Sequence, residues 1–259
     1  MSITIGIVGF GRTGNIVAHE LIKNEEVHLK WVLRKSKTNA GEYASHLLGY
    51  EHDEGKIYSV EDLSPDTFYR DNYVDVIIDF SGSEAIEYYK DAAKYGTRVV
   101  SAVSKYDSTH LAQLKELGTK TAVLYSPNIT LGINFLIEAS KVLQKIIPHA
   151  DIEIIEEHFR DKPDVSGTAL RIAEDLGLDK KKHVNSVRVG GVIGRHEVVF
   201  GLPHQTIRIV HESLDRAAFA EGAMYAAKWL MGKKKGLFTM EEALALSFGR
   251  NTQVFEGGD

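Results

Sequence analysis

The chain has 259 residues, no cysteine and a formal net charge of -5. A hydrophobic content of 43 % allows a sizeable core in one large domain or two smaller ones. The lack of cysteine excludes disulfides, thiolate nucleophiles and cysteine-ligated metals, and it favours a reducing, cytoplasmic compartment. Apolar runs fall short of the roughly 20 residues that span a bilayer, and the negative charge disfavours polyanions. We therefore expect a soluble protein without nucleic-acid or membrane partners.

The first half of the chain alternates apolar β-branched runs with segments of helical periodicity. Strands are predicted at residues 3–10, 27–34, 74–81, 97–104 and 122–127, and helices at residues 14–24, 83–96 and 108–119. This alternation is typical of a mostly parallel sheet that is covered by helices on both faces.

The pattern changes near Pro127, where longer alternating strands replace the short buried ones. After a helix at 132–147, strands are predicted at residues 150–159, 185–201 and 205–213, which favours a mixed or antiparallel sheet. We expect a first domain over residues 1–128 and a second over 129–235, with residues of about 236–259 completing the first. The fold class is α/β, with an α+β C-terminal domain.

A glycine motif lies where the first predicted strand meets the first helix. Gly9, Gly11 and Gly14 form GxGxxG, which provides a tight turn, close backbone approach to a pyrophosphate and a helix N-terminus for its charge. Thr13 lies in the same turn, and Arg12 either points at a phosphate or is a solvated turn residue. The motif predicts a dinucleotide site.

The end of the second strand reads "WVLRKSK" and has no acid. An acid at this position usually accepts hydrogen bonds from the ribose 2′-hydroxyl of NAD. Arg34, Lys35 and Ser36 would instead surround a 2′-phosphate, so we expect NADPH to be preferred over NADH. The alternative is an exposed basic strand end that contacts nothing.

The segment "EEHFRDKPDVSGTAL" combines a histidine and a lysine with the start of a helix. Ser166 is a plausible N-cap, which would leave the N–H groups of Gly167 and Thr168 free to bind a carboxylate. His158 and Lys162, which follow a strand, could supply a proton and a positive charge. In the alternative interpretation, the Ser-Gly-Thr step only caps a helix and His158 only ends a strand.

Several blocks of the chain resemble one family, 4-hydroxy-tetrahydrodipicolinate reductase, formerly dihydrodipicolinate reductase, of the diaminopimelate route to lysine. The segment "EEHFRDKPDVSGTA" is similar to its signature E-x-H-H-x-x-K-x-D-A-P-S-G-T-A. Further blocks that resemble the family are "GIVGFGRTG", "DVIIDFS", "SPNITLGIN", "HESLDRAAFAEGAMYAAKWL" and "GLFTMEEAL". They follow the family's order over almost the whole chain.

The resemblance implies an NAD(P)H-dependent reductase with an N-terminal Rossmann domain and a C-terminal domain for substrate binding and homotetramer formation. The implied reaction reduces 4-hydroxy-tetrahydrodipicolinate, a small dicarboxylate, to tetrahydrodipicolinate. His158 and Lys162 match the catalytic histidine and lysine. Substrate contacts are expected at Phe159, Ser166, Gly167 and Thr168, and further cofactor contacts at Phe80, Ser81, Ala102, Ser104 and Asn128.

The chain departs from the family pattern at three places. Phe159 replaces the second histidine of the signature, Val165 leads directly to Ser166 with one residue lost, and "SAVSK" stands where the family reads close to G-T-T-G. Lys105 in that segment either contacts a substrate carboxylate or is a solvated loop lysine. These departures favour, as an alternative, a related reductase or dehydrogenase for another small carboxylate or amino acid.

A non-catalytic nucleotide sensor is a third interpretation, but a sensor would need neither His158 nor Lys162. We expect no metal site, because the eleven histidines are scattered without helical pairing to carboxylates.

Overall fold

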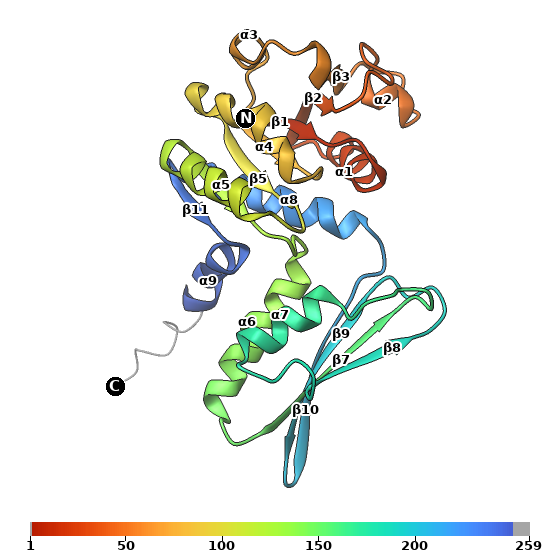
Figure 1. The fold of residues 1–259 in the computed structure, drawn as a ribbon, viewed down its shortest axis with the longest axis vertical. Coiled ribbons are helices and arrows are strands. Elements are labelled where there is room, and N and C mark those ends of the chain that lie inside the picture. Colours follow the sequence, from red (N-terminus) through yellow and green to blue (C-terminus); the bar gives the residue numbers. More distant parts are fainter. Residues whose placement is uncertain (1, 251–259) are drawn as a thin grey trace. The chain divides into compact units, whose positions relative to one another are not determined.

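The computed structural model, drawn in Figure 1, describes residues 2–250. The chain divides into two compact units, each with its own sheet. Of the described residues, the first unit holds 2–130 together with Phe219–Ala243, and the second holds Leu131–Ala218 together with 244–250. No helix within residues 2–250 is long and apolar enough to cross a bilayer.

The first unit contains a seven-stranded sheet in which every pairing is parallel. Its strands are β1 (Ile3–Val8), β2 (Val27–Arg34), β3 (Lys56–Ser59), β4 (Val76–Asp79), β5 (Arg98–Ser101), β6 (Ala122–Tyr125) and β11 (Gly236–Phe238). The helices are α1 (Arg12–Ile22), α2 (Ala44–Leu47), α3 (Pro65–Asp71), α4 (Ile86–Tyr89), α5 (Ser108–Lys120) and α8 (Ala217–Leu230), with 3-10 turns η1 (Val60–Asp62), η2 (Ser83–Ala85) and η3 (Lys90–Tyr95). Helix α9 (Met240–Arg250) crosses the boundary between the units.

The strand order β3-β2-β1-β4-β5-β6-β11 confirms the predicted Rossmann-like parallel sheet. The chain runs outward from β1 to β3 and then crosses back to β4, so the strand order reverses between β1 and β4. Open parallel sheets bind ligands at such a point, beside the carboxyl ends of the strands. All four residues of β4 are buried, as expected for a strand that is covered on both faces.

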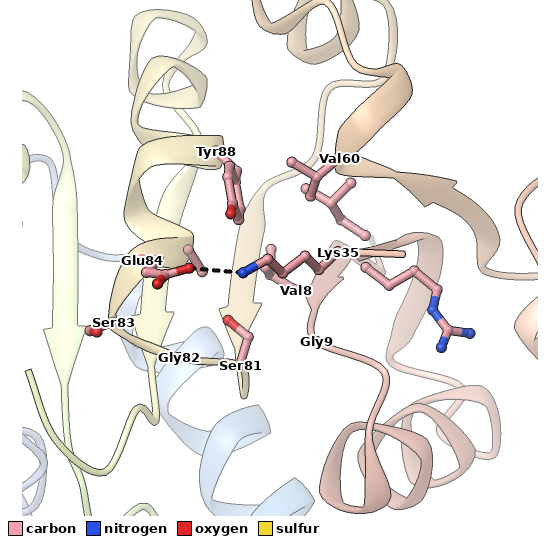
Figure 2. A pocket seen from close by; sticks show the side chains of 12 residues that line it. Val8, Gly9, Lys35, Val60, Ser81, Gly82, Ser83, Glu84 and Tyr88 are labelled. Carbon is pink, nitrogen blue, oxygen red and sulfur yellow. Dashed lines mark hydrogen bonds and ion pairs between the residues drawn. The ribbon is translucent and has the colours of Figure 1, made fainter. Parts of the chain in front are cut away.

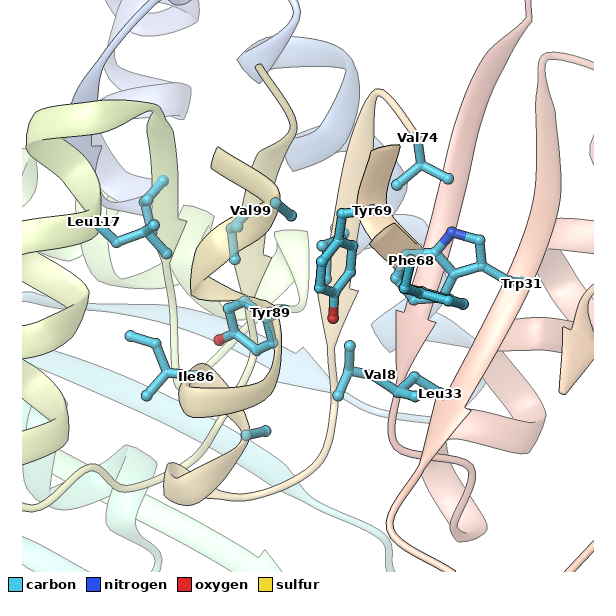
Figure 3. Packing of buried hydrophobic residues seen from close by; sticks show 14 of the residues in the cluster. Val8, Trp31, Leu33, Phe68, Tyr69, Val74, Ile86, Tyr89, Val99 and Leu117 are labelled. Atoms are coloured by element: carbon cyan, nitrogen blue, oxygen red, sulfur yellow. The ribbon is translucent and has the colours of Figure 1, made fainter. Parts of the chain in front are cut away.

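Trp31 of β2 is an anchor of the first core. Its side chain is fully buried and packs edge-on against Phe68 and Tyr69 of α3, with ring centroids 5.5 and 6.1 Å away (Figure 3). The indole Nε1 donates a hydrogen bond of 2.9 Å to the carbonyl oxygen of Asn72. This polar contact satisfies the only donor of the indole while its rings fill the core.

The second unit contains a four-stranded sheet of order β10-β9-β7-β8. Its elements are β7 (Asp151–His158), β8 (Val184–Arg188), β9 (Arg195–Leu202), β10 (Gln205–Glu212), α6 (Leu131–Ile146) and α7 (Gly167–Asp175). Strands β7 and β8 are parallel and joined through α7, whereas the β7–β9 and β9–β10 pairs are antiparallel. The prediction of a mixed sheet is thereby confirmed.

Alternation along the strands decides which face of this sheet is covered. Ile152 and Ile154 of β7 are buried in one core with Val198 and Phe200 of β9 and with apolar residues of α6 and α7. Figure 1 shows α6 and α7 together beside the sheet. Because alternate residues of a strand point to opposite faces, residues 156 and 158 share the face of Ile154.

Two sequence expectations need correction. The predicted strand 185–201 is two strands, β8 and β9, because the glycine-rich "GGVIG" segment turns the chain and Gly190 adopts a φ of +51°. The chain also rejoins the first unit at Phe219 and not near residue 235, since α8 packs there: Asn24 Nδ2 donates to Met224 Sδ, and Lys228 pairs with Glu26. Residues 251–259 of the predicted return lie outside the described residues.

The Trp31→Ala substitution is expected to lower the free energy of unfolding by about 3–5 kcal/mol, because it removes a fully buried aromatic ring from the first core. Urea unfolding followed by circular dichroism measures the change. Leu47→Ala, which truncates an exposed side chain of α2, serves as the control and should change stability by less than about 0.5 kcal/mol. A loss below about 1 kcal/mol for Trp31→Ala would contradict this description of the core.

Candidate active site

The glycine turn after β1 is as tight as its sequence predicts. Gly9 has a φ of +96°, which favours glycine, and its N–H donates to the Leu33 carbonyl oxygen at 2.8 Å. A Cβ added to Gly14 would lie 2.0 Å from the Gly9 carbonyl oxygen, so a side chain cannot be accommodated there without moving the backbone. The helix therefore starts close against the end of β1.

Helix α1 begins at Arg12, and no described side chain caps its N-terminus at Gly11. Asn15 instead uses its Nδ2 to hold the carbonyl oxygens of Phe10 at 3.1 Å and Gly11 at 2.9 Å. The uncapped N–H groups of the first turn are then available for an anion, as at other helix N-termini that bind phosphates. Arg12 is exposed at this turn. Sequence reasoning did not single out Asn15, although it directly follows the glycine motif.

A cavity of about 310 Å³ adjoins this turn at the carboxyl ends of β1, β2 and β4 (Figure 2). Arg34 and Lys35 line it, whereas Ser36 is exposed and bonds to Thr38. Lys35 reaches across the cavity, where its Nζ lies 3.1 Å from Glu84 Oε2. The hydrogen bond to Glu84 raises the pKa of Lys35. The other lining residues are Val8, Gly9, Leu33, Val60, Ser81, Gly82, Ser83, Ala85 and Tyr88.

A second cavity, of about 210 Å³, gathers five of the predicted cofactor residues. Its lining consists of Thr13, Phe80, Ser81, Ala102, Ser104, Pro127, Ile129 and Phe219. Asn128 lies between Pro127 and Ile129, and its carbonyl oxygen accepts a hydrogen bond of 2.7 Å from Ser126 Oγ. Thr13 and Ser104, the two of these five that lie farthest apart in the sequence, thus line the same cavity.

The buried carboxyl of Asp79 fixes the loop that borders both cavities. Its Oδ1 accepts hydrogen bonds from the Ser81 N–H at 2.9 Å and the Ser81 hydroxyl at 2.5 Å, and its Oδ2 accepts from the Tyr89 hydroxyl at 2.9 Å. Burial raises the pKa of Asp79 to about 6 despite these hydrogen bonds. Asp79 therefore acts as an internal anchor that sets the position of Ser81.

In the second unit, the carboxylate of Glu156 is the centre of a polar cluster. Glu156 is fully buried, and Arg188 donates to its two oxygens at 2.7 and 2.8 Å. Ser186 Oγ, the Ser166 N–H and His158 Nδ1 lie 2.6, 3.1 and 2.5 Å from the same carboxylate. Burial raises the pKa of Glu156, but these hydrogen bonds outweigh burial and hold it at about 2. The carboxylate is therefore charged at neutral pH.

This carboxylate fixes the ring of His158. An ionised carboxylate only accepts hydrogen bonds, so His158 Nδ1 carries a proton and Nε2 is left for another partner. Beside Nε2 lies Gly194, where a Cβ would be only 3.2 Å away, so the absence of a side chain there keeps space at this nitrogen. Glu156 thereby holds the ring in one orientation, with a proton on Nδ1.

Arg188 also holds the backbone of the loop that contains Lys162. Its Nε and Nη2 donate to the carbonyl oxygens of Lys162 at 3.2 Å and Asp164 at 2.9 Å. Lys162 itself is partly exposed, and its ammonium has no ion pair or hydrogen bond within the described part of the chain. A fixed backbone with an unpaired ammonium suits a lysine that binds or protonates a ligand.

The Ser-Gly-Thr step begins helix α7. Ser166 is its N-cap, and its Oγ accepts a hydrogen bond of 3.4 Å from the Ala169 N–H. The same Oγ lies 2.8 Å from Nε2 of His196, a buried residue of β9 whose pKa is lowered to about 4 by burial. Gly167 is exposed and Thr168 is partly exposed at the first turn. Sequence reasoning missed Arg188 and His196, because their partners lie on other elements. It also missed Glu156, which the spacing of two positions from His158 places on the same face of β7 and could have revealed.

The departures from the family signature lie mostly at the surface. Phe159 is 43 % exposed and Val165 is 42 % exposed, so neither is a core residue. Lys105 is exposed, whereas Val103 of the "SAVSK" segment is buried. Among residues 2–250 there is no group of three or more His, Asp or Glu side chains that could hold a metal ion.

Comparisons with known proteins identify relatives over nearly the whole chain. Residues 3–129 match the family profile "Dihydrodipicolinate reductase, N-terminus", and residues 130–244 match "Dihydrodipicolinate reductase, C-terminus". The chain is 30 % identical to the 4-hydroxy-tetrahydrodipicolinate reductase of Aquifex aeolicus over 272 residues, which cover 95 % of this chain and 100 % of the relative. It is 37 % identical to the enzyme of the same name from Caldanaerobacter subterraneus over 190 residues, 65 % of this chain and 76 % of the relative.

A solved structure has the same fold. Dipicolinate-bound dihydrodipicolinate reductase from Paenisporosarcina sp. TG-14 superimposes with a TM-score of 0.77 at 21 % identity, covering 93 % of this chain and 99 % of that one. The family resemblance seen in the sequence motifs and the two-part α/β architecture are both confirmed.

The Glu156→Gln substitution is expected to destabilise the protein more at neutral pH than in acid. The folded pKa of Glu156, about 2, lies below its ordinary value of 4.5, so its contribution to stability is complete above pH 4.5 and is lost as the pH falls toward 2. The difference in unfolding free energy between wild type and variant should therefore shrink by roughly 1–2 kcal/mol between about pH 6 and about pH 3.5.

Urea unfolding at both pH values measures this difference. Glu153→Gln, which alters a half-exposed acid on the same strand, should show little pH dependence. A difference for Glu156→Gln that stays constant with pH would contradict the assignment of Glu156 as a buried carboxylate.

Proposed function

The chain belongs to the dihydrodipicolinate reductase family, and we propose that it reduces 4-hydroxy-tetrahydrodipicolinate to tetrahydrodipicolinate in the diaminopimelate route to lysine. The match of both family profiles, which together span residues 3–244, carries this conclusion. The enzyme is a pyridine-nucleotide-dependent oxidoreductase with a Rossmann-like unit. The proposal assigns the nucleotide to the first unit and the chemistry of the substrate to residues of the second.

The nucleotide would be held by the glycine turn and by the two cavities of the first unit. The N–H groups at the start of α1 suit the pyrophosphate, and the second cavity, with Ser81 and Ser104, suits the nicotinamide end. The reduced nicotinamide supplies the hydride when it is bound. Arg34 and Lys35 line the first cavity, which supports a preference for NADPH over NADH.

The substrate of the proposed reaction is a small dicarboxylate. The start of α7, behind the Ser166 cap, is a helix N-terminus, and a helix N-terminus favours a negative charge. The related Paenisporosarcina enzyme was solved with dipicolinate bound, a ligand of this chemical class. In the proposal, Ser166, Gly167 and Thr168 hold one carboxylate, and exposed Phe159 covers the heterocycle.

His158 and Lys162 are the proposed catalytic residues. Hydride addition to a conjugated C=C–C=N system leaves negative charge on the adjoining atoms, which a nearby cation stabilises and a proton donor neutralises. In the proposal, the Lys162 ammonium stabilises this charge. His158, protonated on Nε2 as well as on Nδ1, donates the Nε2 proton while Glu156 holds the Nδ1–H. The group that stabilises the negative charge and the group that donates the proton are thus two different side chains.

A homotetramer in the cytoplasm completes the proposal. The face of the second sheet opposite α6 and α7 carries exposed Val187 and Val210 beside the Arg195–Glu197 ion pair, and this mixture suits association with a second copy. The absence of cysteine fits a reducing compartment.

The first test follows NADPH oxidation at the nicotinamide absorbance, with 4-hydroxy-tetrahydrodipicolinate generated in situ and NADH assayed in parallel. We expect turnover with both nucleotides and a higher kcat/KM with NADPH, because Arg34 and Lys35 line the first cavity. Tight nucleotide binding without turnover would contradict the proposed reaction and favour a different small carboxylate or amino acid as substrate.

The Lys162→Ala variant should lose about 10²–10⁴-fold in kcat, the usual effect of removing a group that stabilises charge or transfers a proton, while its Kd for NADPH stays unchanged. Steady-state kinetics and calorimetric titration measure the two quantities. Lys181→Ala, an exposed lysine of the same unit, is the control and should behave as wild type. Near-wild-type turnover of Lys162→Ala would remove Lys162 from the mechanism.

A further inference from the structure

We infer that Glu84 is a specificity-determining residue that limits the preference for NADPH and keeps NADH usable. The inference rests on the proposed use of a nicotinamide nucleotide and adds a residue to its binding site. It starts from the first cavity, where Glu84 and Lys35 face each other from opposite walls (Figure 2).

The two residues follow separate strands, β2 and β4, which lie on either side of β1. Lys35 directly follows β2, and Glu84 lies in the turn η2 after β4, 49 positions later. In a Rossmann-like sheet the adenosine ribose lies beside the end of the second strand. The cavity that both side chains line is therefore the place where a ribose 2′-substituent would sit.

The charges around this cavity are partly balanced. Arg34 and Lys35 contribute two cations, and Glu84 is the only acid among the described residues that line the cavity. Lys35 Nζ lies 3.1 Å from Glu84 Oε2. A 2′-phosphate, which carries a charge of about -1.5 to -2, would lie near the Glu84 carboxylate when it binds beside Lys35 in this cavity. Repulsion from Glu84 therefore offsets part of the attraction by the two cations.

The 2′-hydroxyl of NAD, in contrast, can be bound favourably by the Glu84 carboxylate. A carboxylate accepts hydrogen bonds from ribose hydroxyls, and NAD-binding sites usually supply one from the end of the second strand. That position has no acid here, but Glu84 brings a carboxylate to the same cavity from the opposite wall. The site thus contains a partner for each form of the nucleotide.

The Lys35–Glu84 pair is weak enough to rearrange. Their side chains are 78 % and 66 % exposed, and exposed ion pairs contribute little to stability. Either nucleotide can therefore separate the two side chains. Glu84 biases the choice between the nucleotides without blocking one of them.

The test measures nucleotide binding by the full-length protein without any turnover. Calorimetric titration of wild type and Glu84→Gln gives the Kd values for NADP+ and NAD+. We expect Glu84→Gln to shift the ratio Kd(NAD+)/Kd(NADP+) toward NADP+ by about three- to tenfold, as for the loss of one unit charge near a phosphate at the surface. Raising the salt concentration should reduce this shift, because exposed charges are screened.

Glu87→Gln is the matched control. Glu87 lies three positions later, pairs with Lys90 and does not line the cavity, so its substitution removes the same charge from the same region. The inference is overturned if Glu84→Gln leaves the ratio unchanged, or if Glu87→Gln shifts it equally. If wild type turns over the substrate but Glu84→Gln leaves the ratio of Kd values unchanged, only the inference about Glu84 is rejected. If Glu84→Gln shifts the ratio but wild type shows no turnover, only the proposed reaction is rejected.

Discussion

The buried carboxylate of Glu156 is the constraint on which the proposed catalytic geometry depends. A charge that is buried away from water must be paired or hydrogen-bonded. The Glu156 carboxylate accepts hydrogen bonds from Arg188, Ser186, Ser166 and His158. These residues come from β7, β8 and the start of α7, so satisfying one carboxylate aligns three elements. The histidine ring, the lysine loop and the helix N-terminus are therefore positioned together, and each is held by a hydrogen bond to Glu156 or to its partner Arg188.

The first unit uses the same kind of constraint at its nucleotide site. Buried Asp79 ends β4 and fixes Ser81, and the reversal of strand order brings this loop beside the glycine turn after β1. Between them lies the cavity that Arg34 and Lys35 line. In both units a buried acid in the last three residues of a strand holds the loop that follows. In the second unit, the buried His158 and Ser166 both contact this acid and are proposed to act on the substrate.

The sequence predicted the parts of the fold that depend on local pattern. Continuous apolar runs predicted the central strands β1, β2 and β4, and GxGxxG predicted the turn before α1. It failed where local signals were short or interrupted: β3, α2 and β11 have three or four residues each, and the glycines of "GGVIG" divide one predicted strand into two. The early return of α8 to the first unit depends on packing against Asn24 and Glu26, which no periodicity reveals.

By itself, the sequence determined the motif residues of the candidate site, since Gly9 to Gly14 and His158 to Thr168 are each contiguous and have local chemical logic. Only the tertiary structure decided their partners. The bonded side chains are 32 positions apart in the sequence for Glu156 and Arg188, 30 for Ser166 and His196, and 49 for Lys35 and Glu84. The physical reason is that strand register and strand order determine which distant side chains share a face or an edge, and register is a property of the packed sheets.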